Sequence, residues 1–313
     1  MSTAIIYLTF LIGIILVVKG GDYFVEASTC IAKVLRIPTF IIGATIVSIA
    51  TTLPEVIVSV MAAAQGKPEM AIGNAVGSVI ANTGLIMALA LIFMAIEAKR
   101  VHYMNRGILL IASAVTLYLA CGNGVLSGVG SFVLIGICIF YIIDNIKSAK
   151  KHREPEDNQE IDKRNIKKQC LMFIVGAAGI IVGSSFLVSS GSEIAIMFNV
   201  SERVIAVTMV AIGTSLPELV TTLTAIAKKE AGLSIGNIIG ANIIDLTIIL
   251  PLCSLVSGGP LPVAIQTINI DLPFALGLTL MAMIPLFVKE KGYTLQGILM
   301  FMGYIFYLFV AVA

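Results

Sequence analysis

The chain alternates between long apolar runs and short polar breaks along nearly its whole length. A run of about 20 mostly apolar residues is long enough to cross a lipid bilayer as a helix. Several runs also contain Gly, Pro or polar residues, so not every helix needs to be straight. The pattern predicts ten membrane-spanning helices, over residues 4–28, 37–64, 70–94, 106–121, 125–144, 169–190, 201–227, 233–257, 268–288 and 293–312.

The basic residues test this count, because the cytoplasmic connections of membrane proteins carry an excess of Lys and Arg. If the N-terminus lies outside, seventeen of the twenty Lys and Arg residues fall in connections on the cytoplasmic side. Only Lys67 and Arg203 fall on the outer side, and Lys19 lies within the first span. A wrong number of spans would scramble this partition. We therefore expect ten helices with both termini outside.

The longest polar break, at 145–168, is rich in charges of both signs and poor in apolar residues. Such a segment cannot bury a core of its own and is expected to be a solvated linker. The chain is thereby divided into a first unit of five helices at 1–144, a cytoplasmic linker at 145–168 and a second unit of five helices at 169–313.

The two units are related by an internal repeat with a constant offset of 163 residues. Residues 42–55 match residues 205–218 at 8 of 14 positions, and residues 72–82 match 235–245 at 5 of 11. Two apolar segments paired by chance would share roughly one residue in ten. Because each unit has an odd number of helices, the second must cross the membrane in the opposite orientation. Inverted repeats of this kind occur in secondary transporters, with ion sites at the repeat interface.

The composition supports a membrane protein and excludes several classes of function. Hydrophobic residues make up 58% of the chain and charged residues 12%, whereas soluble proteins carry about 25% charged residues. The net charge of +2, without a basic face, argues against nucleic-acid binding. The five cysteines form no C-x-x-C pair, and both histidines lie in charged connections. With no phosphate-binding or catalytic motif either, we expect a transporter and not an enzyme, without a cofactor.

Two acidic residues, Glu55 and Glu218, occupy equivalent positions of the repeat and lie deep within apolar runs. A charge at the bilayer centre costs at least ~2.5–3.5 kcal/mol. The inverted repeat can bring the two carboxylates together, where they repel each other and need a cation or protons. Because two negative charges match one divalent ion, the sequence predicts a cation site between the units.

Further oxygen atoms lie near both glutamates. In the first unit, Ser48 and Thr52 share a helical face with Glu55, because the three are separated by four and three residues. In the second unit, Ser215 takes the place of Thr52 and Ala211 that of Ser48. The hydroxyl groups can either coordinate an ion or bond to carbonyl groups of their own helix.

A proline immediately precedes each glutamate, at Pro54 and Pro217. Proline has no N–H to donate, and its ring displaces the carbonyl four residues earlier. The sequence therefore predicts a kink in each motif, with carbonyl groups, including those of Thr51 and Thr214, facing an ion. Backbone groups freed at membrane depth are tolerated only where something satisfies them.

The third and eighth spans carry a second set of polar residues. Ser78 and Asn82 lie one turn apart, and their counterparts are Ala241 and Asp245. The candidate ligands are then carboxylate, hydroxyl, amide and carbonyl oxygens. Such hard ligands favour Ca²⁺, Mg²⁺, Mn²⁺ or Na⁺ over zinc and copper.

Each of these spans also has a Gly-Asn pair near its start, at 73–74 and 236–237. Glycine allows a break in the helix or a close helix contact. Asparagine is a good N-terminal cap. We expect each asparagine to cap a half-helix.

The doubled motifs resemble the α-repeats of the sodium/calcium exchanger branch of the cation/calcium exchanger (Ca²⁺:cation antiporter) superfamily, in its prokaryotic form. The first unit reads G-A-T…T-T-L-P-E with G-N-A-V-G-S…N, and the second T-M-V-A-I-G-T-S-L-P-E with G-N-I-I-G-A-N-I-I-D. The resemblance covers nearly the whole chain. It implies an all-α integral membrane protein that exchanges Ca²⁺ for Na⁺ by alternating access. Spans one and six would slide against the remaining core. From the compactness of the chain we expect a protein of the cell membrane, and we expect it to act as a monomer.

The resemblance also implies roles for individual residues. The central Ca²⁺ site would be formed by two side chains and two backbone carbonyls, from Glu55, Glu218, Thr51 and Thr214. The flanking Na⁺ sites would use Ser48, Thr52 and Ser78 on one side, and Ala211 (through its carbonyl), Thr214 and Ser215 on the other. The centre would be lined by Asn82 and Asp245.

Three features depart from the family's pattern. Residues 50–52 read Ala-Thr-Thr where Gly-Thr-Ser is usual, and Ser48 stands where its repeat mate is alanine. Ala241 replaces the serine that would match Ser78, so one Na⁺ site would lose a ligand. Exchange of Ca²⁺ or another divalent cation for H⁺ therefore stays open as an alternative, with Asp245 and the glutamates exchanging protons. A passive channel is less favoured, because channels usually obtain their symmetry from oligomers.

Overall fold

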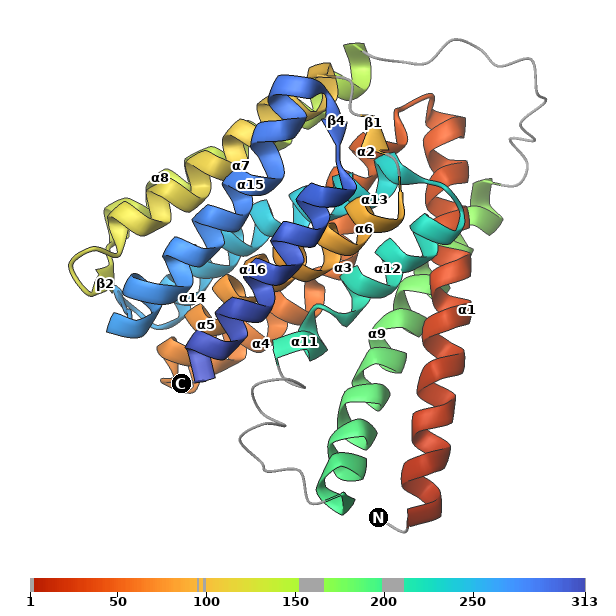
Figure 1. Ribbon diagram of the computed structural model, residues 1–313, viewed down its shortest axis with the longest axis horizontal. Coiled ribbons are helices and arrows are strands. Elements are labelled where there is room, and N and C mark those ends of the chain that lie inside the picture. Colours follow the sequence, from red (N-terminus) through yellow and green to blue (C-terminus); the bar gives the residue numbers. More distant parts are fainter. Residues whose placement is uncertain (1–2, 95, 98–99, 152–165, 199–210, 313) are drawn as a thin grey trace.

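The computed structural model describes the chain except for residues 1–2, 95, 98–99, 152–165, 199–210 and 313 (Figure 1). Within these limits the protein is almost entirely helical. The strands found there are four two-residue segments, β1 (Ile96–Glu97), β2 (Val125–Leu126), β3 (Leu261–Pro262) and β4 (Lys291–Gly292). β1 pairs with β4 and β2 with β3, both antiparallel, so connections of the two halves join each other.

The helices fall into two series, with π-helical turns labelled η. The first series is α1 (Thr3–Leu35), α2 (Thr39–Ile42), η1 (Gly43–Val47), α3 (Ser48–Thr51), α4 (Leu53–Ala64), α5 (Pro68–Ala81), η2 (Asn82–Met87), α6 (Ala88–Phe93), α7 (Arg100–Ala120) and α8 (Gly128–Lys151). The second series is α9 (Ile166–Met197), α11 (Ala211–Thr214), α12 (Leu216–Ala227), α13 (Ala231–Ile244), η5 (Asp245–Ile249), α14 (Leu250–Val256), η6 (Thr267–Asp271), α15 (Leu272–Lys289) and α16 (Thr294–Val312).

Several helices of the first half begin and end 163 residues before helices of the second half, which is the offset of the sequence repeat. α3, α4 and α5 begin and end 163 residues before α11, α12 and α13, respectively. The turns η2 and η5 begin at the equivalent residues Asn82 and Asp245. The two series therefore break and resume their helices at equivalent places.

The described residues contain eight helices that are long and apolar enough to cross a membrane. A ninth candidate is the pair Thr39–Thr51 and Leu53–Ala64, which is bent by 44°. Of the span expected at 201–227, residues 201–210 lie outside the described chain and the rest forms α11 and α12. The protein is thus a multi-pass helical membrane protein, and the count of ten spans and their orientation stay predictions.

Some helices continue beyond the apolar runs that predicted them. α8 ends at Lys151 and α9 begins at Ile166, so both enter the segment expected as a linker at 145–168. The remainder of that segment, 152–165, lies outside the described residues. α7 begins at Arg100, and Arg106 is fully buried in it. Arg106 is the first residue of the span expected at 106–121 and one of the seventeen basic residues counted on the cytoplasmic side, and its pairing with Asp144 lets it lie inside the protein.

α1 and α9 form an antiparallel pair along one side of the molecule (Figure 1). A Cβ atom added to Gly20 would lie 2.9 Å from the carbonyl oxygen of Gly176, and one added to Gly183 would lie 2.9 Å from that of Gly13. Residue numbers rise along α1 as they fall along α9, which defines the antiparallel direction. The glycines let the two backbones approach closely.

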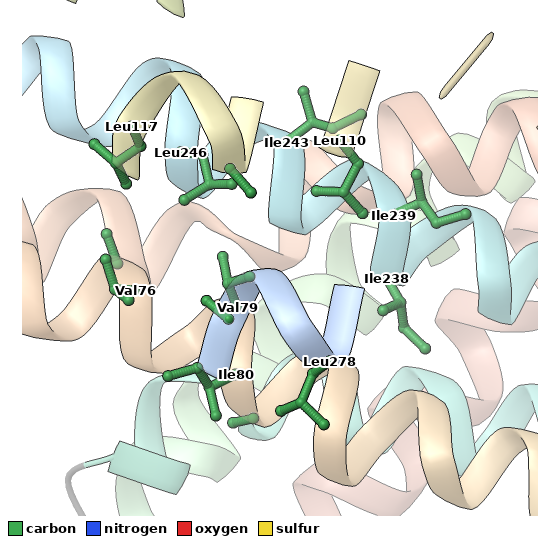
Figure 2. Close-up of a cluster of buried hydrophobic side chains, with 14 of the residues drawn as sticks. Val76, Val79, Ile80, Leu110, Leu117, Ile238, Ile239, Ile243, Leu246 and Leu278 are labelled. Atoms are coloured by element: carbon green, nitrogen blue, oxygen red, sulfur yellow. The ribbon is translucent and has the colours of Figure 1, made fainter. Parts of the chain in front are cut away.

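The helices that carry the polar motifs surround a packed apolar core (Figure 2). α5 contributes Val76, Val79 and Ile80, α7 contributes Leu110 and Leu117, α13 contributes Ile238, Ile239 and Ile243, η5 contributes Leu246 and α15 contributes Leu278. All of these side chains are buried. The core holds α5 beside α13, while α4 packs on α5 and α12 on α13. The two acidic motifs are thereby brought to the middle of the molecule.

Candidate ion-binding site

The two glutamates lie just after breaks in helices. α3 ends at Thr51 and α4 begins at Leu53, with Pro54 in its first turn. The 44° bend there confirms the kink expected in the first motif. The second motif repeats the interruption, since α11 ends at Thr214 and α12 begins at Leu216. Each glutamate therefore lies in the first turn of a helix, where the helix dipole favours a negative charge.

Both carboxylates are sealed inside the protein, with Glu55 1% and Glu218 0% exposed. Within the described chain, neither oxygen of Glu55 has a hydrogen-bond partner, and Oε2 of Glu218 has none either. A buried charge is costly unless it is paired or neutralised. These oxygen atoms are thus suited to bind a cation or a proton.

A pair of hydrogen bonds joins the two halves around the site. The hydroxyl of Thr51 donates to Oδ1 of Asn237 at 3.2 Å, and that of Thr214 donates to Oδ1 of Asn74 at 3.2 Å. Each donor and each acceptor is related to its counterpart by the 163-residue offset. The broken helix of each half is therefore held by an asparagine of the other half.

A second relationship between the halves involves the carboxylates themselves. Thr52 donates to Oε1 of Glu218 at 3.2 Å. The equivalent residue Ser215 lies beside the carboxylate of Glu55, although its hydroxyl does not meet strict hydrogen-bond geometry. Each glutamate thus faces a hydroxyl group from the opposite half.

Ser78, Asn82 and Asp245 add further buried oxygen atoms, with exposed fractions of 1%, 1% and 0%. Among the residues that the structure describes, their side-chain polar atoms have no hydrogen-bond partners. Asp245 lies close enough to both glutamates for their charges to repel. Three carboxyl groups in such a space cannot all be ionised unless cations balance them.

Two further candidate residues, Ser48 and Ala211, differ from the three above because neither has an unpartnered side-chain oxygen. The hydroxyl of Ser48 donates to the carbonyl oxygen of Thr45 at 3.0 Å, and its side chain packs against Gly240. It thus satisfies a carbonyl group of its own helix, which was one of the two possibilities for this residue. Ala211 is the first residue of α11, and the role of its carbonyl stays a prediction.

The expectation that asparagines cap half-helices is wrong. Asn74 and Asn237 lie in the second turns of α5 and α13, because these helices begin earlier, at Pro68 and Ala231. Their side chains bond across the interface, and Asn74 also donates to Oγ of Ser59 at 2.9 Å. Their repetition at the 163-residue offset was a signal that they belong to the site.

A further contact between the halves had no signal in the sequence. Nδ2 of Asn242 donates to Oγ1 of Thr83 at 2.8 Å, and both residues are buried. The repeat counterparts of Asn242 and Thr83 are Val79 and Leu246. Because neither counterpart is polar, the repeat could not reveal this bond.

The site is built mainly of oxygen atoms. In the described part of the chain, no three His, Cys, Asp or Glu side chains form a cluster that could hold a metal ion by themselves. Hydroxyl, amide and carbonyl oxygens would have to complete the coordination around Glu55 and Glu218. This donor set suits hard cations such as Ca²⁺ and Na⁺.

A multi-pass helical protein with buried carboxylates at two equivalent helix breaks has the architecture of a secondary cation transporter. The family model described as sodium/calcium exchanger protein matches residues 5–146 and 168–313. The chain belongs to the sodium/calcium exchanger family.

Individual relatives agree with this assignment. The chain is 29% identical to the sodium/calcium exchanger MaX1 of Methanosarcina acetivorans, over 97% of each chain. It is 35% identical to an uncharacterised membrane protein of Methanocaldococcus jannaschii, over 76% of this chain and 77% of that protein. Its structure is similar to that of the sodium-calcium exchanger NCX_Mj soaked with Na⁺ and Sr²⁺, with a TM-score of 0.84, 31% identity and 97% of each chain covered.

Proposed function

We propose that this protein is a secondary antiporter that exchanges Ca²⁺ for Na⁺ across the cell membrane by alternating access. It would consist of ten spans in two inverted five-helix units at 1–144 and 169–313, joined by a cytoplasmic linker at 145–168, with both termini outside. It would act as a monomer, without enzymatic activity or a cofactor. Family membership supports cation exchange, and the names of MaX1 and NCX_Mj as sodium/calcium exchangers support Na⁺ as the coupling ion.

The observation that carries the proposal is the pair of sealed carboxylates, Glu55 and Glu218, with three of their four oxygen atoms unpartnered in the described chain. Both ions need these oxygens, so the site can hold Ca²⁺ or sodium ions but not both. A site with two uncompensated carboxylates crosses the membrane centre less readily than one balanced by cations. This difference couples the two fluxes.

Thr51, Thr52, Thr214 and Ser215 would complete the sites around the two carboxylates, and Ser78 and Asn82 would extend them. Thr52 and Ser215 already face the carboxylates, and their hydroxyl oxygens retain lone pairs for an ion. Ser48 donates to the carbonyl oxygen of Thr45, and its hydroxyl oxygen would likewise offer lone pairs to an ion.

The decisive experiment is the uptake of ⁴⁵Ca²⁺ by sodium-loaded proteoliposomes diluted into sodium-free buffer at clamped pH and membrane potential. The matched control vesicles contain choline in place of sodium. Uptake that requires the outward sodium gradient supports Na⁺/Ca²⁺ exchange. Equal uptake in both preparations would contradict it.

Exchange of Ca²⁺ for H⁺ is the second candidate, favoured by two observations. Ala241 offers no hydroxyl opposite Ser78, and Asp245 is buried with both oxygens unpartnered in the described chain. In this case, uptake in the absence of sodium would follow an outward proton gradient. The choline-loaded vesicles, prepared at low pH and diluted into sodium-free buffer of high pH, distinguish the two mechanisms.

A further inference from the structure

A buried polar cluster lies between α7 and α8, away from the candidate ion site. Arg106 of α7 is fully buried and donates through Nε to Oδ1 of Asn145 at 2.9 Å. Its Nη2 lies 3.4 Å from Oδ2 of Asp144, whose other oxygen accepts from Nδ2 of Asn105 at 2.8 Å. Nδ2 of Asn145 donates to the carbonyl oxygen of Tyr141 at 3.0 Å, one turn earlier. The ion pair and Tyr141 are therefore parts of one connected network.

This network contacts the first part of the broken second span at two points. The guanidinium of Arg106 lies over the ring of Phe40 in α2, 5.6 Å from its centroid, and that ring also contacts Tyr103 at a centroid distance of 4.3 Å. One turn later, the hydroxyl of Tyr141 donates to the carbonyl oxygen of Ala44. Ala44 lies in the π-helical turn η1, a kind of irregularity that is frequent at functional sites.

η1 also packs directly on α13. A Cβ atom added to Gly43 would collide with the carbonyl oxygen of Leu233, and one added to Gly236 would collide with that of Phe40. η1 thus contacts both the backbone of α13 and the side chain of Tyr141. Asn237, which accepts from Thr51, follows Gly236 directly on α13.

Within the residues that the structure describes, the ion pair of this arrangement belongs to the first half alone. The repeat counterparts of Arg106 and Asp144 are Asn269 and Tyr307, which cannot form an ion pair. Tyr307 instead donates to Oδ1 of Asp271 at 3.1 Å and joins α16 to η6. The ion pair is therefore an addition to the repeated design, whereas Tyr141 has a tyrosine counterpart in Tyr304.

We propose that Arg106, Asp144 and Tyr141 are positioning residues for the ion site. They hold residues 39–51 against α13, which keeps the hydroxyls of Thr51 and Thr52 aligned with Asn237 and Glu218. The network does not touch the ions, and it acts through the position of the broken helix. The inference rests on the proposed function, because it assigns these two threonines to the cation site.

The primary test is Tyr141→Phe in the full-length protein, because this change removes one hydroxyl and preserves the ring. The KM for Ca²⁺ in proteoliposome uptake should rise about three- to tenfold, the scale of one buried hydrogen bond. The maximal rate should change less than about twofold, since the carboxylates are unaltered. A second readout uses the protein in detergent, whose melting temperature should rise as Ca²⁺ binds. The Ca²⁺ concentration at half of this rise should increase by the same factor. This second readout does not depend on the coupling ion.

Tyr307→Phe is the matched control, since it also removes a tyrosine hydroxyl bonded within the membrane-spanning region, and it should leave both Ca²⁺ values unchanged. Arg106→Lys keeps the charge but removes the bond from Nε to Asn145, so it should raise the KM in the same direction. The inference is overturned if Tyr141→Phe lowers the melting temperature without Ca²⁺ while both Ca²⁺ values stay at wild-type level. It is also overturned if Tyr307→Phe shifts them equally. Wild-type protein without sodium-dependent uptake would reject Na⁺ coupling, whereas the melting experiment would still test the positioning role.

Discussion

The hydroxyl of Thr52 donates to Oε1 of Glu218 at 3.2 Å, so a residue of the first repeat contacts the central carboxylate of the second. Its counterpart Ser215 lies beside Glu55. The surroundings of each carboxylate therefore include a hydroxyl group of the other repeat. A cation bound at either carboxylate would thus be held by both repeats together.

Replacement of either glutamate should abolish exchange. Glu55→Gln and Glu218→Gln each remove one of the two charges that balance a divalent ion, so we expect a loss of ⁴⁵Ca²⁺ uptake of at least about a hundredfold, equivalent to about 2.7 kcal/mol. Glu193→Gln is the control, since Glu193 is exposed on α9. Membrane insertion is measured in parallel. Substantial uptake by both glutamine variants would remove the central claim.

The hydroxyl at position 52 should matter more than the shape of the side chain. Thr52→Val preserves the size but removes the donor to Glu218, and hydrogen bonds to charged groups contribute about 1.5–3 kcal/mol. We expect the KM for Ca²⁺ to rise at least about tenfold. Thr52→Ser copies the residue of the second repeat and should stay within about threefold of wild type. Equal effects of the two substitutions would mean that packing, and not the hydroxyl, matters.

The asymmetry between Ser78 and Ala241 predicts an effect on sodium. Ala241→Ser adds a hydroxyl at the position equivalent to Ser78, so it should raise the apparent affinity for Na⁺ if sodium is the coupling ion. Ser78→Ala should lower it. Sodium dependence of ⁴⁵Ca²⁺ uptake over a range of internal sodium concentrations measures both. If neither variant changes this dependence, these positions lie outside the sodium sites.

Asp245 should control the response to pH. Protons and cations compete for buried carboxylates, so Ca²⁺ uptake should decrease as the pH is lowered. Asp245→Asn copies the residue of the first repeat, Asn82, and removes one site of competition. We expect this variant to keep exchange and to have a flatter pH profile than wild type. A profile identical to that of wild type would assign Asp245 a structural role.

Much of the protein could be predicted from local patterns. Apolar runs define helices because lipid requires every backbone polar group to be satisfied within the segment. The Pro54 kink was visible because proline lacks a donor in any surroundings. The repeat offset identified Glu55 and Glu218 as a pair, and their depth in apolar runs indicated a site.

The hydrogen-bond partners of individual side chains could not be predicted from the sequence. The offset marked Asn74 and Asn237 as related, but their position relative to the helix start suggested caps. Only the packing of α5 on α11 and of α13 on α3 shows that each reaches a threonine of the other half. Ser48 could bond inside or outside its helix, and close packing against Gly240 accompanies the inward bond.

The sequence by itself determined the class of protein, the duplicated plan and the acidic centre, because hydrophobic length, periodicity and repetition are properties of the chain read in order. The tertiary structure alone decided that Arg106 is buried and that hydrogen bonds cross between the repeats. A charge such as that of Arg106 is stable inside the protein only when Asp144 and Asn145 lie within reach. Such pairings depend on which helices meet and at what level, and residues 39 positions apart meet only because α7 and α8 fold back on each other.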